Sequence, residues 1–274
     1  MKLMTHLKMA SRLALLALGA LGMSIVSPGT ASAAPPKPPT ATIVLVPGAW
    51  ADSSSWDGVI SRLQAARYTV IVAANPLRSL GSDSDYVAGI INNIKGPVVL
   101  VGHSYGGAVI TNAATGADNV VALVYVAGFA PAAGESALEL TGKFPGSLLS
   151  GALAPPVALA DGTHDLYVQQ NKFRSVFAAD VPEREAKLMA ATQRPVTDAA
   201  AAGASGPPAW MSIPSWFVYG SADKVIPPAA HAFMAQRAGA KETIVVKGAS
   251  HLVMVSHPSI VAKLIERAAA ATAM

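Results

Sequence analysis

The sequence predicts an α/β fold with a mainly parallel sheet of about six strands and helices on both faces. Short β-branched segments alternate with longer amphipathic ones, which is the pattern of repeated strand–helix–strand units. The strand segments are continuously apolar, as expected of parallel strands that are buried on both faces. The 274-residue chain is 52% hydrophobic and 13% charged, with a mean hydropathy of +0.41, and this composition excludes an intrinsically disordered protein.

Six segments have the strand pattern: residues 42–46, 68–73, 98–101, 120–126, 216–219 and 243–246. Helices are predicted between them. One opens at Ser53 and continues through Trp56, and another opens at Ser82 with apolar residues at helical spacing. The last helix starts near His257 and Pro258, because proline in a first turn loses no backbone hydrogen bond.

The alternating pattern stops between the fourth and fifth strands. Residues 128–213 are rich in alanine, glycine and proline, with a predicted helix over 183–191 and no clear strand. An unstructured loop of this length is improbable inside a compact domain. We therefore interpret residues 42–274 as one domain with a helical cap inserted at about 128–213.

Residues 1–33 have the pattern of a secretory signal peptide. Lys2, Lys8 and Arg12 precede an apolar stretch over 13–26, and small residues follow at the expected cleavage site, Ala31-Ser32-Ala33. A membrane anchor is the alternative, but the apolar stretch is shorter than the ~20 residues that a bilayer core requires. We expect export to the periplasm or the medium without a remaining membrane anchor. The proline-rich residues 34–41 then form an extended tether.

Charge and cysteine content exclude several functions. Removal of the three basic signal residues lowers the formal net charge from +4 to +1, so the remaining chain lacks the basic excess that nucleic-acid binding needs. The absence of cysteine excludes disulfides, thiolate metal sites and cysteine nucleophiles. No Walker loop or dinucleotide fingerprint is present, so we expect neither a cofactor nor a catalytic metal.

The strongest catalytic motif is Gly102-His103-Ser104-Tyr105-Gly106-Gly107, directly after a predicted strand and directly before a helix-like segment. A nucleophilic serine on a tight strand-to-helix turn needs flanking glycines, because side chains there would clash. The alternative is a glycine-rich turn with an ordinary serine, and the flanking strand and helix favour the nucleophile. Ser104 is therefore the predicted nucleophile.

Such a serine needs a histidine to accept its proton and a carboxylate to orient the histidine. Asp223 follows the fifth predicted strand and His251 follows the sixth. Both should project from carboxyl ends of strands, where open parallel sheets bind ligands. Glu135, beyond the fourth strand, is the rival acid, and a helix-capping role is the alternative for Asp223.

The remaining histidines are less well placed: His6, His103, His164, His231 and His257. His103 is expected to pack beneath the turn, and His231 falls within a predicted helix. The oxyanion hole needs two backbone N–H donors. We assign these to Tyr105 and Ala49, with Trp50 as the alternative to Ala49.

With these motifs the chain resembles the alpha/beta-hydrolase superfamily, and more closely the branch of plant methylesterases, hydroxynitrile lyases and their bacterial relatives. The resemblance covers residues 42–268. It is carried by LVPGAW, VGHSYGGAV, YVAGFAPAAGES, DVPEREAKLMAATQRP, PSWFVYGSADKVIPP and GASHLVMVSHP. It implies an alpha/beta-hydrolase fold, with Ser104, His251 and Asp223 as the triad and Ala49 and Tyr105 at the oxyanion hole.

Two departures from the family pattern affect the expected activity. Relatives usually have His-Gly where this chain has Pro47-Gly48. Hydroxynitrile lyases usually have threonine in place of Gly48 and a lysine after the catalytic histidine, where this chain has Leu252.

We therefore expect an exported serine hydrolase that cleaves small, largely apolar carboxylic esters, with a small-molecule ester as its partner. Apolar cap residues favour such a substrate, although each of them more often only packs the cap on the core: Phe144, Leu148, Leu149, Leu166, Phe173, Phe177, Met189 and Trp210. The alternatives are a lyase or carbon–carbon hydrolase that uses the same triad, and a secreted ligand-binding protein.

Overall fold

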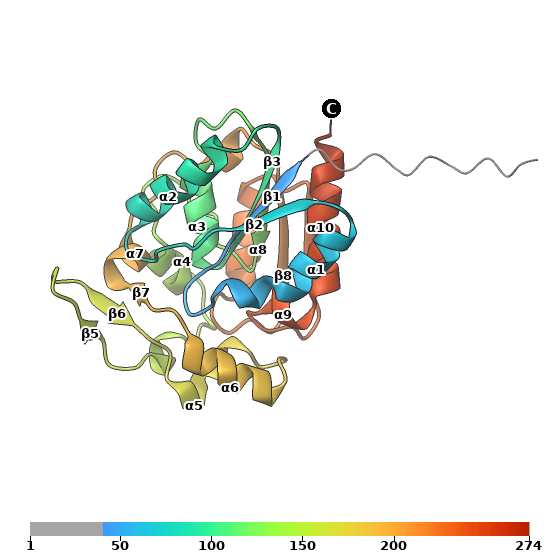
Figure 1. Ribbon diagram of the computed structural model, residues 1–274. Coiled ribbons are helices and arrows are strands. Elements are labelled where there is room, and N and C mark those ends of the chain that lie inside the picture. Colours follow the sequence, from blue (N-terminus) through green and yellow to red (C-terminus); the bar gives the residue numbers. More distant parts are fainter. Residues whose placement is uncertain (1–40, 274) are drawn as a thin grey trace, which may run out of the picture. The chain divides into compact units, whose positions relative to one another are not determined.

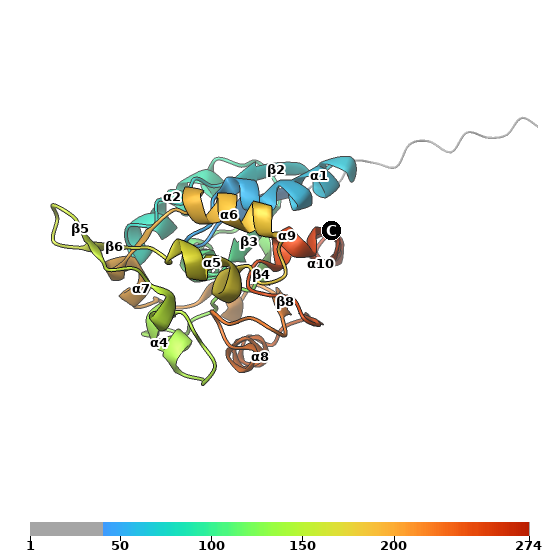
Figure 2. The ribbon, with the colours of Figure 1, turned by 90° about the horizontal axis from the view of Figure 1, so that it is seen from below.

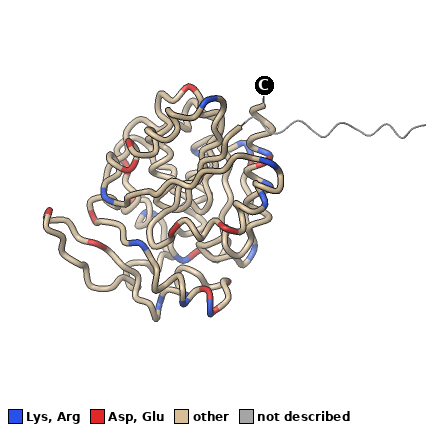
Figure 3. Tube along the Cα trace, viewed as in Figure 1, with Lys and Arg blue, Asp and Glu red and all other residues tan. Residues whose placement is uncertain are grey.

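The computed structural model describes residues 41–273 (Figure 1). The predicted signal peptide, residues 1–33, and all but the last residue of the predicted tether lie outside this range. Within it, no helix combines the length and apolar character needed to cross a bilayer. Lys, Arg, Asp and Glu are interspersed along the described trace (Figure 3).

The centre of the structure is the predicted parallel sheet, with strand order β2-β1-β3-β4-β8-β9. All five neighbouring pairs are parallel. The prediction of six strands is confirmed, with end points that differ by at most two residues. The strands are β1 (Thr42–Val46), β2 (Thr69–Val72), β3 (Val98–His103), β4 (Val120–Val126), β8 (Ser215–Gly220) and β9 (Glu242–Val246).

Helices cover both faces of this sheet. On one face α10 (Pro258–Ala271) packs against β3, β4 and β8, and α1 (Asp57–Ala65) packs on α10. On the other face α3 (Tyr105–Ala113) packs against β1 and β3 and contacts α2 (Leu80–Asn92), as Figure 1 shows. Outside the segment between β4 and β8, η1 (Ser53–Trp56) and α9 (Val253–Ser256) pack against α1, and α8 (Pro228–Arg237) packs against β8.

The start of α2 differs from the prediction. The helix begins at Leu80 rather than at Ser82, because Ser79 is its N-cap. The Ser79 hydroxyl accepts a hydrogen bond from the Ser82 backbone N–H at 3.1 Å. Two serines three positions apart both have N-cap propensity, and the sequence alone did not identify the one that caps the helix.

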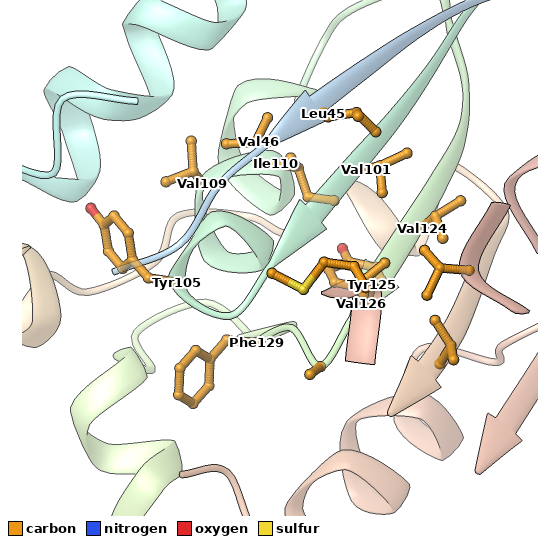
Figure 4. Close-up of a cluster of buried hydrophobic side chains, with 14 of the residues drawn as sticks. Leu45, Val46, Val101, Tyr105, Val109, Ile110, Val124, Tyr125, Val126 and Phe129 are labelled. Carbon is orange, nitrogen blue, oxygen red and sulfur yellow. The ribbon is translucent and has the colours of Figure 1, made fainter. Parts of the chain in front are cut away.

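The core lies on both faces of the central strands, against α3 on one side and α10 on the other. Every residue of β3 is buried, and the Tyr125 and Phe217 rings stack at 4.5 Å between β4 and β8. Figure 4 shows Val101, Val124 and Ile110 in this cluster. Burial of each large apolar side chain contributes roughly 1.5–3 kcal/mol relative to exposure. The carboxyl ends of the central strands are thereby held on a rigid support.

The segment between β4 and β8 contains both helices and a small sheet (Figure 2). Strands β5, β6 and β7 form an antiparallel sheet of three strands. The expectation that this segment has no strand is wrong, because strands of two or three residues are too short to give a sequence pattern. The elements are α4 (Ala137–Gly142), η2 (Ser150–Ala152), β5 (Val157–Ala158), β6 (His164–Leu166), α5 (Gln170–Phe177), α6 (Glu183–Thr192), β7 (Val196–Thr197), α7 (Asp198–Ala202) and η3 (Ala209–Met211).

Candidate active site

Ser104 occupies a tight turn between β3 and α3. Its backbone has φ 52° and ψ −123°, a strained conformation for a residue with a side chain. The turn is held by a hydrogen bond from Phe129 N–H to Ser104 C=O at 3.0 Å. A Cβ atom at Gly102 would lie 2.5 Å from the Gly106 carbonyl oxygen, so glycine is required for this close approach. The turn has the features expected of a nucleophile elbow.

Asp223 and His251 meet at the same edge of the sheet, beyond the carboxyl ends of β8 and β9. The Asp223 Oδ2 atom lies 2.7 Å from His251 Nδ1, and both side chains are fully buried. Asp223 Oδ1 accepts hydrogen bonds from the backbone N–H groups of Val225 and Ile226 at 2.8 and 3.0 Å. The Asp223 carboxylate therefore caps the turn after β8 and also orients His251, so the two alternatives weighed for it are compatible.

The electrostatics of Asp223 favour the ionised carboxylate. Burial raises the pKa of Asp223, but the charge interaction with His251 and the hydrogen bonds from His231 and His251 outweigh it and hold the pKa well below its usual range. The carboxylate therefore stays negatively charged at neutral pH beside the His251 imidazole.

Glu135, the rival acid, lies in a different set of contacts. Its carboxylate pairs with Arg237 at 2.7 Å and with Lys143 at 3.3 Å. Burial raises the pKa of Glu135, but the hydrogen bond from Arg237 and further contacts lower it to about 2. Among its contacts with described residues none is to a histidine. The geometry therefore favours Asp223 as the partner of His251.

The His251 ring is enclosed by aromatic groups. The His103 ring lies 4.8 Å from it and the Phe177 ring 5.0 Å from it. His103 is buried beneath the turn as expected, and burial lowers its pKa well below the usual value. His251 Nε2 is also buried and has no hydrogen-bond partner in the part of the chain that the structure describes. This nitrogen remains available to accept a proton.

The predicted oxyanion-hole donors are the backbone N–H groups of Tyr105 and Ala49. Tyr105 is the first residue of α3, where N–H groups have no partner within the helix. Of the two candidates after β1, the Trp50 N–H donates to the Arg194 carbonyl at 2.8 Å, whereas no backbone acceptor for the Ala49 N–H occurs within residues 41–273. Ala49 and Tyr105 both line the same cavity as Ser104. The geometry therefore favours Ala49 over Trp50.

Gly48 and Pro47 place the loop after β1 against the serine turn. A Cβ atom at Gly48 would lie 2.6 Å from the His103 carbonyl oxygen and 2.7 Å from Ser104 Cβ. The buried Asn75 side chain donates to the Pro47 carbonyl at 2.9 Å. Asn75 thus supports the loop at the position where relatives usually have histidine.

The Tyr105 side chain has a separate role from its backbone N–H. Its hydroxyl donates to Asp83 Oδ2 at 2.8 Å, and both groups are buried. Burial raises the pKa of Asp83 above its usual value, although this hydrogen bond and others oppose the shift. The Tyr105–Asp83 pair joins α3 to α2.

A cavity of about 390 Å³ opens beside Ser104. Its polar lining residues are Ser104, Tyr105, Thr141, Ser147 and Ser150, and none of the described residues that line it is charged or a histidine. Three of the eight apolar cap residues singled out from the sequence line it: Phe144, Leu149 and Leu166. Asp223 and His251 are buried and do not line this cavity.

Two residues of this site could not be assigned from the sequence: His231 lies 3.1 Å from Asp223 Oδ2, and Asn75 supports Pro47. Phe177 was expected only as an apolar cap residue, and its ring contacts His251. His231 was set aside because it falls in a helix. A histidine eight residues after the predicted acid, in the helix that follows the same strand, was the available signal for it.

The chain is similar in sequence and structure to known hydrolases. The chain is 25% identical over 247 residues to an alpha/beta hydrolase, nvfD, of Aspergillus novofumigatus, covering 83% of this chain and 96% of that protein. A pyrethroid hydrolase from Sphingobium faniae JZ-2 is 26% identical, with a TM-score of 0.66 over 85% of this chain and 98% of the other.

A methylesterase from Arabidopsis has the same fold, with a TM-score of 0.67, 16% identity and coverage of 84% of this chain and 99% of the other. The model of the alpha/beta hydrolase family matches residues 43–264, which is most of the chain. The chain therefore belongs to the alpha/beta hydrolase family.

Proposed function

We propose that this protein is a serine hydrolase that cleaves small, uncharged carboxylic esters. The observation that carries the proposal is the 2.7 Å contact of Asp223 with His251 at the sheet edge where the strained turn presents Ser104. A hydroxyl becomes a useful nucleophile only beside a base that is itself oriented by a third group.

In the proposed reaction Ser104 Oγ attacks the ester carbonyl while His251 Nε2 takes the hydroxyl proton. The backbone N–H groups of Ala49 and Tyr105 stabilise the negative oxygen of the tetrahedral intermediate. His251 then gives the proton to the leaving alcohol, and an acyl-enzyme remains on Ser104. Water, deprotonated by the same histidine, releases the carboxylic acid and restores Ser104.

The lining of the cavity supports a neutral substrate. A charged group on the acyl or alcohol side would lose its hydration beside apolar surfaces, without an opposite charge to compensate. The 26%-identical relative is a pyrethroid hydrolase. A pyrethroid therefore belongs in the set of test substrates beside simple nitrophenyl esters.

Ester hydrolysis is favoured over lyase chemistry by the residue at position 48. At the observed backbone geometry a side chain there would meet Ser104 Cβ at 2.7 Å, which leaves no room for the hydroxyl of a threonine. Leu252, which follows His251, is buried and supplies no charge. A mandelonitrile-type substrate, assayed beside a nitrophenyl ester, separates the two reactions.

We also propose that the protein is exported, with cleavage after Ala33. The basis is the sequence pattern alone: three basic residues, an apolar stretch and the Ala31-Ser32-Ala33 site. The intact mass of the protein recovered from outside the cytoplasm tests this. We expect the mass of a chain that begins at Ala34. A mass that still includes residues 1–33 would contradict the proposed cleavage.

The activity is tested by nitrophenyl butyrate hydrolysis, with Ser104→Ala and His251→Ala beside the wild type. Each is expected to reduce kcat roughly 10³-fold or more. Ser61→Ala on the exposed side of α1 is the control, because its hydroxyl donates to the Asp57 carbonyl of its own helix. Many turnovers per molecule support an enzyme, whereas one slow turnover with tight ligand retention would favour a binding protein.

A further inference from the structure

A second buried histidine reaches the carboxylate of Asp223. His231 projects from α8, and its Nε2 atom lies 3.1 Å from Asp223 Oδ2. The same oxygen lies 2.7 Å from His251 Nδ1. Both imidazoles are fully buried, so water does not replace either contact. One carboxylate oxygen therefore lies between two imidazole rings.

The hydrogen bonds that the Asp223 carboxylate can accept define the protonation state and tautomer of His231. An ionised carboxylate only accepts hydrogen bonds, so a ring nitrogen at 3.1 Å is held there as N–H. His231 Nδ1 has no partner among residues 41–273, as expected of the unprotonated nitrogen of a neutral ring. Burial lowers the pKa of His231, although its hydrogen bond to Asp223 opposes the shift. The Tyr219 ring stacks on His231 at 4.7 Å and fixes its plane.

We propose that His231 is a positioning residue for the proposed ester hydrolysis: its Nε2–H holds Asp223 Oδ2 against His251 and takes up part of the carboxylate charge. This inference rests on the proposed function. Oδ1 is already fixed by the backbone N–H groups of Val225 and Ile226, so His231 is the group that fixes the remaining oxygen besides His251 itself.

Among the titratable groups around His251 in the described residues, Asp223 is the charged group that bonds to its ring directly. His103 contacts the ring from the serine turn and is kept neutral by burial. Asp180, from the loop after α5, accepts a hydrogen bond from Ser250 beside His251 and lies 3.6 Å from His257. When Asp223 gives up part of its charge to His231, protonated His251 is held less tightly and returns its proton to the leaving group more readily.

The test compares two substitutions at the same site. His231→Gln keeps an N–H donor of similar reach, and His231→Leu keeps the bulk but removes the donor. We expect His231→Leu to lower kcat at least tenfold and to move the acidic limb of the kcat/KM profile upward by roughly half a pH unit. His231→Gln should stay within about threefold of the wild type with the limb in place. Met234→Leu is the control for a buried change on the same helix, because Met234 accepts a hydrogen bond from the Ala130 N–H and makes no contact with Asp223 that the structure records.

Equal behaviour of the Gln and Leu variants would overturn the proposal, as would a Leu variant with only a lower Tm and an unchanged profile. Imidazole ¹⁵N–¹H spectra of the wild type supply a measurement that needs no variant to fold and no activity. His231 should show an Nε2–H signal shifted downfield, and an Nδ1–H tautomer there would contradict the proposal. A wild type that hydrolyses no ester would instead refute the proposed function. The contact between His231 and Asp223 would then be tested by the spectrum alone.

Discussion

The Nδ1 atom of His251 lies 2.7 Å from Oδ2 of Asp223, and neither side chain is exposed. Loss of one member of a buried pair leaves the other without its partner in a medium that solvates it poorly. The same contact fixes Nδ1 as the nitrogen of His251 that carries the proton and leaves Nε2 unprotonated. The roles of these residues can be tested one at a time.

The identity of the acid is tested by Asp223→Asn beside Glu135→Gln. The asparagine lacks the charge that stabilises the imidazolium, and in one amide orientation it also turns an amide nitrogen toward His251 Nδ1. We expect kcat to fall roughly 10³–10⁴-fold. Glu135→Gln should stay within about threefold, because Glu135 pairs with Arg237 and Lys143. Steady-state hydrolysis of a nitrophenyl ester by folded variants distinguishes them. A larger loss of kcat in Glu135→Gln would show that Glu135, and not Asp223, is the acid that orients His251.

Glu135 should instead govern stability in acid. Its pKa is lowered to about 2 in the folded protein, so its contribution is present above the ordinary value of 4.5 and is lost as the pH falls from there toward about 2. Glu135→Gln should reduce the free energy of unfolding on the order of 1–2 kcal/mol at pH 7, and this difference should vanish toward pH 2. Urea unfolding of both proteins across this range measures it. A difference independent of pH would contradict the assignment.

Tyr105→Phe should separate the role of the Tyr105 hydroxyl from that of its backbone N–H. The substitution removes the hydroxyl that donates to buried Asp83 but keeps the backbone N–H. Stability should fall by about 1–3 kcal/mol, while kcat stays within roughly threefold. Thermal unfolding and ester hydrolysis are measured on the same preparation. A large loss of kcat at unchanged Tm would show that the hydroxyl, and not the backbone, acts in the reaction.

Gly48→Ala tests the fit between the loop after β1 and the serine turn. The added Cβ would lie 2.7 Å from Ser104 Cβ, so the loop must move and the Ala49 N–H moves with it. Displacement of one oxyanion donor should lower kcat roughly 10²-fold. Gly81→Ala, where no atom lies within 4 Å of the new Cβ, is the matched control. Equal activity of the two variants would argue against Ala49 as a donor.

The cavity lining predicts discrimination against charged esters. The nitrophenyl ester of a hemisuccinate should have a kcat/KM at least roughly 100-fold below that of the butyrate, because its carboxylate loses hydration without a compensating charge. Parallel progress curves at equal substrate concentration measure the ratio. Equal rates would require that the acyl chain lies outside this cavity.

Where the signal is local, the sequence was sufficient to predict the strands and the loops in which the predicted site residues lie. Strands such as β1 and β4 are short segments rich in β-branched residues. Ser104 directly follows β3, and Asp223 and His251 lie in the loops after β8 and β9. The strands β5 and β7 have two residues each, so no periodicity exists to detect.

The contacts that were missed depend on packing between elements. His231 reaches Asp223 because α8 packs beside β8, and Asn75 reaches Pro47 because the chain after β2 passes the loop after β1. The choice between Asp223 and Glu135 also depends on a distant partner, since Arg237 lies 102 residues from the glutamate along the chain. Sequence spacing does not encode these distances.

The most direct test of the account is covalent labelling by a fluorophosphonate, a probe that reacts with activated serines, followed by peptide mass spectrometry. We predict modification of Ser104 in the wild type, none at that peptide in Ser104→Ala and severely slowed labelling in His251→Ala. Folded wild-type protein that remains unlabelled, or that is labelled at another serine, would contradict the serine-hydrolase mechanism.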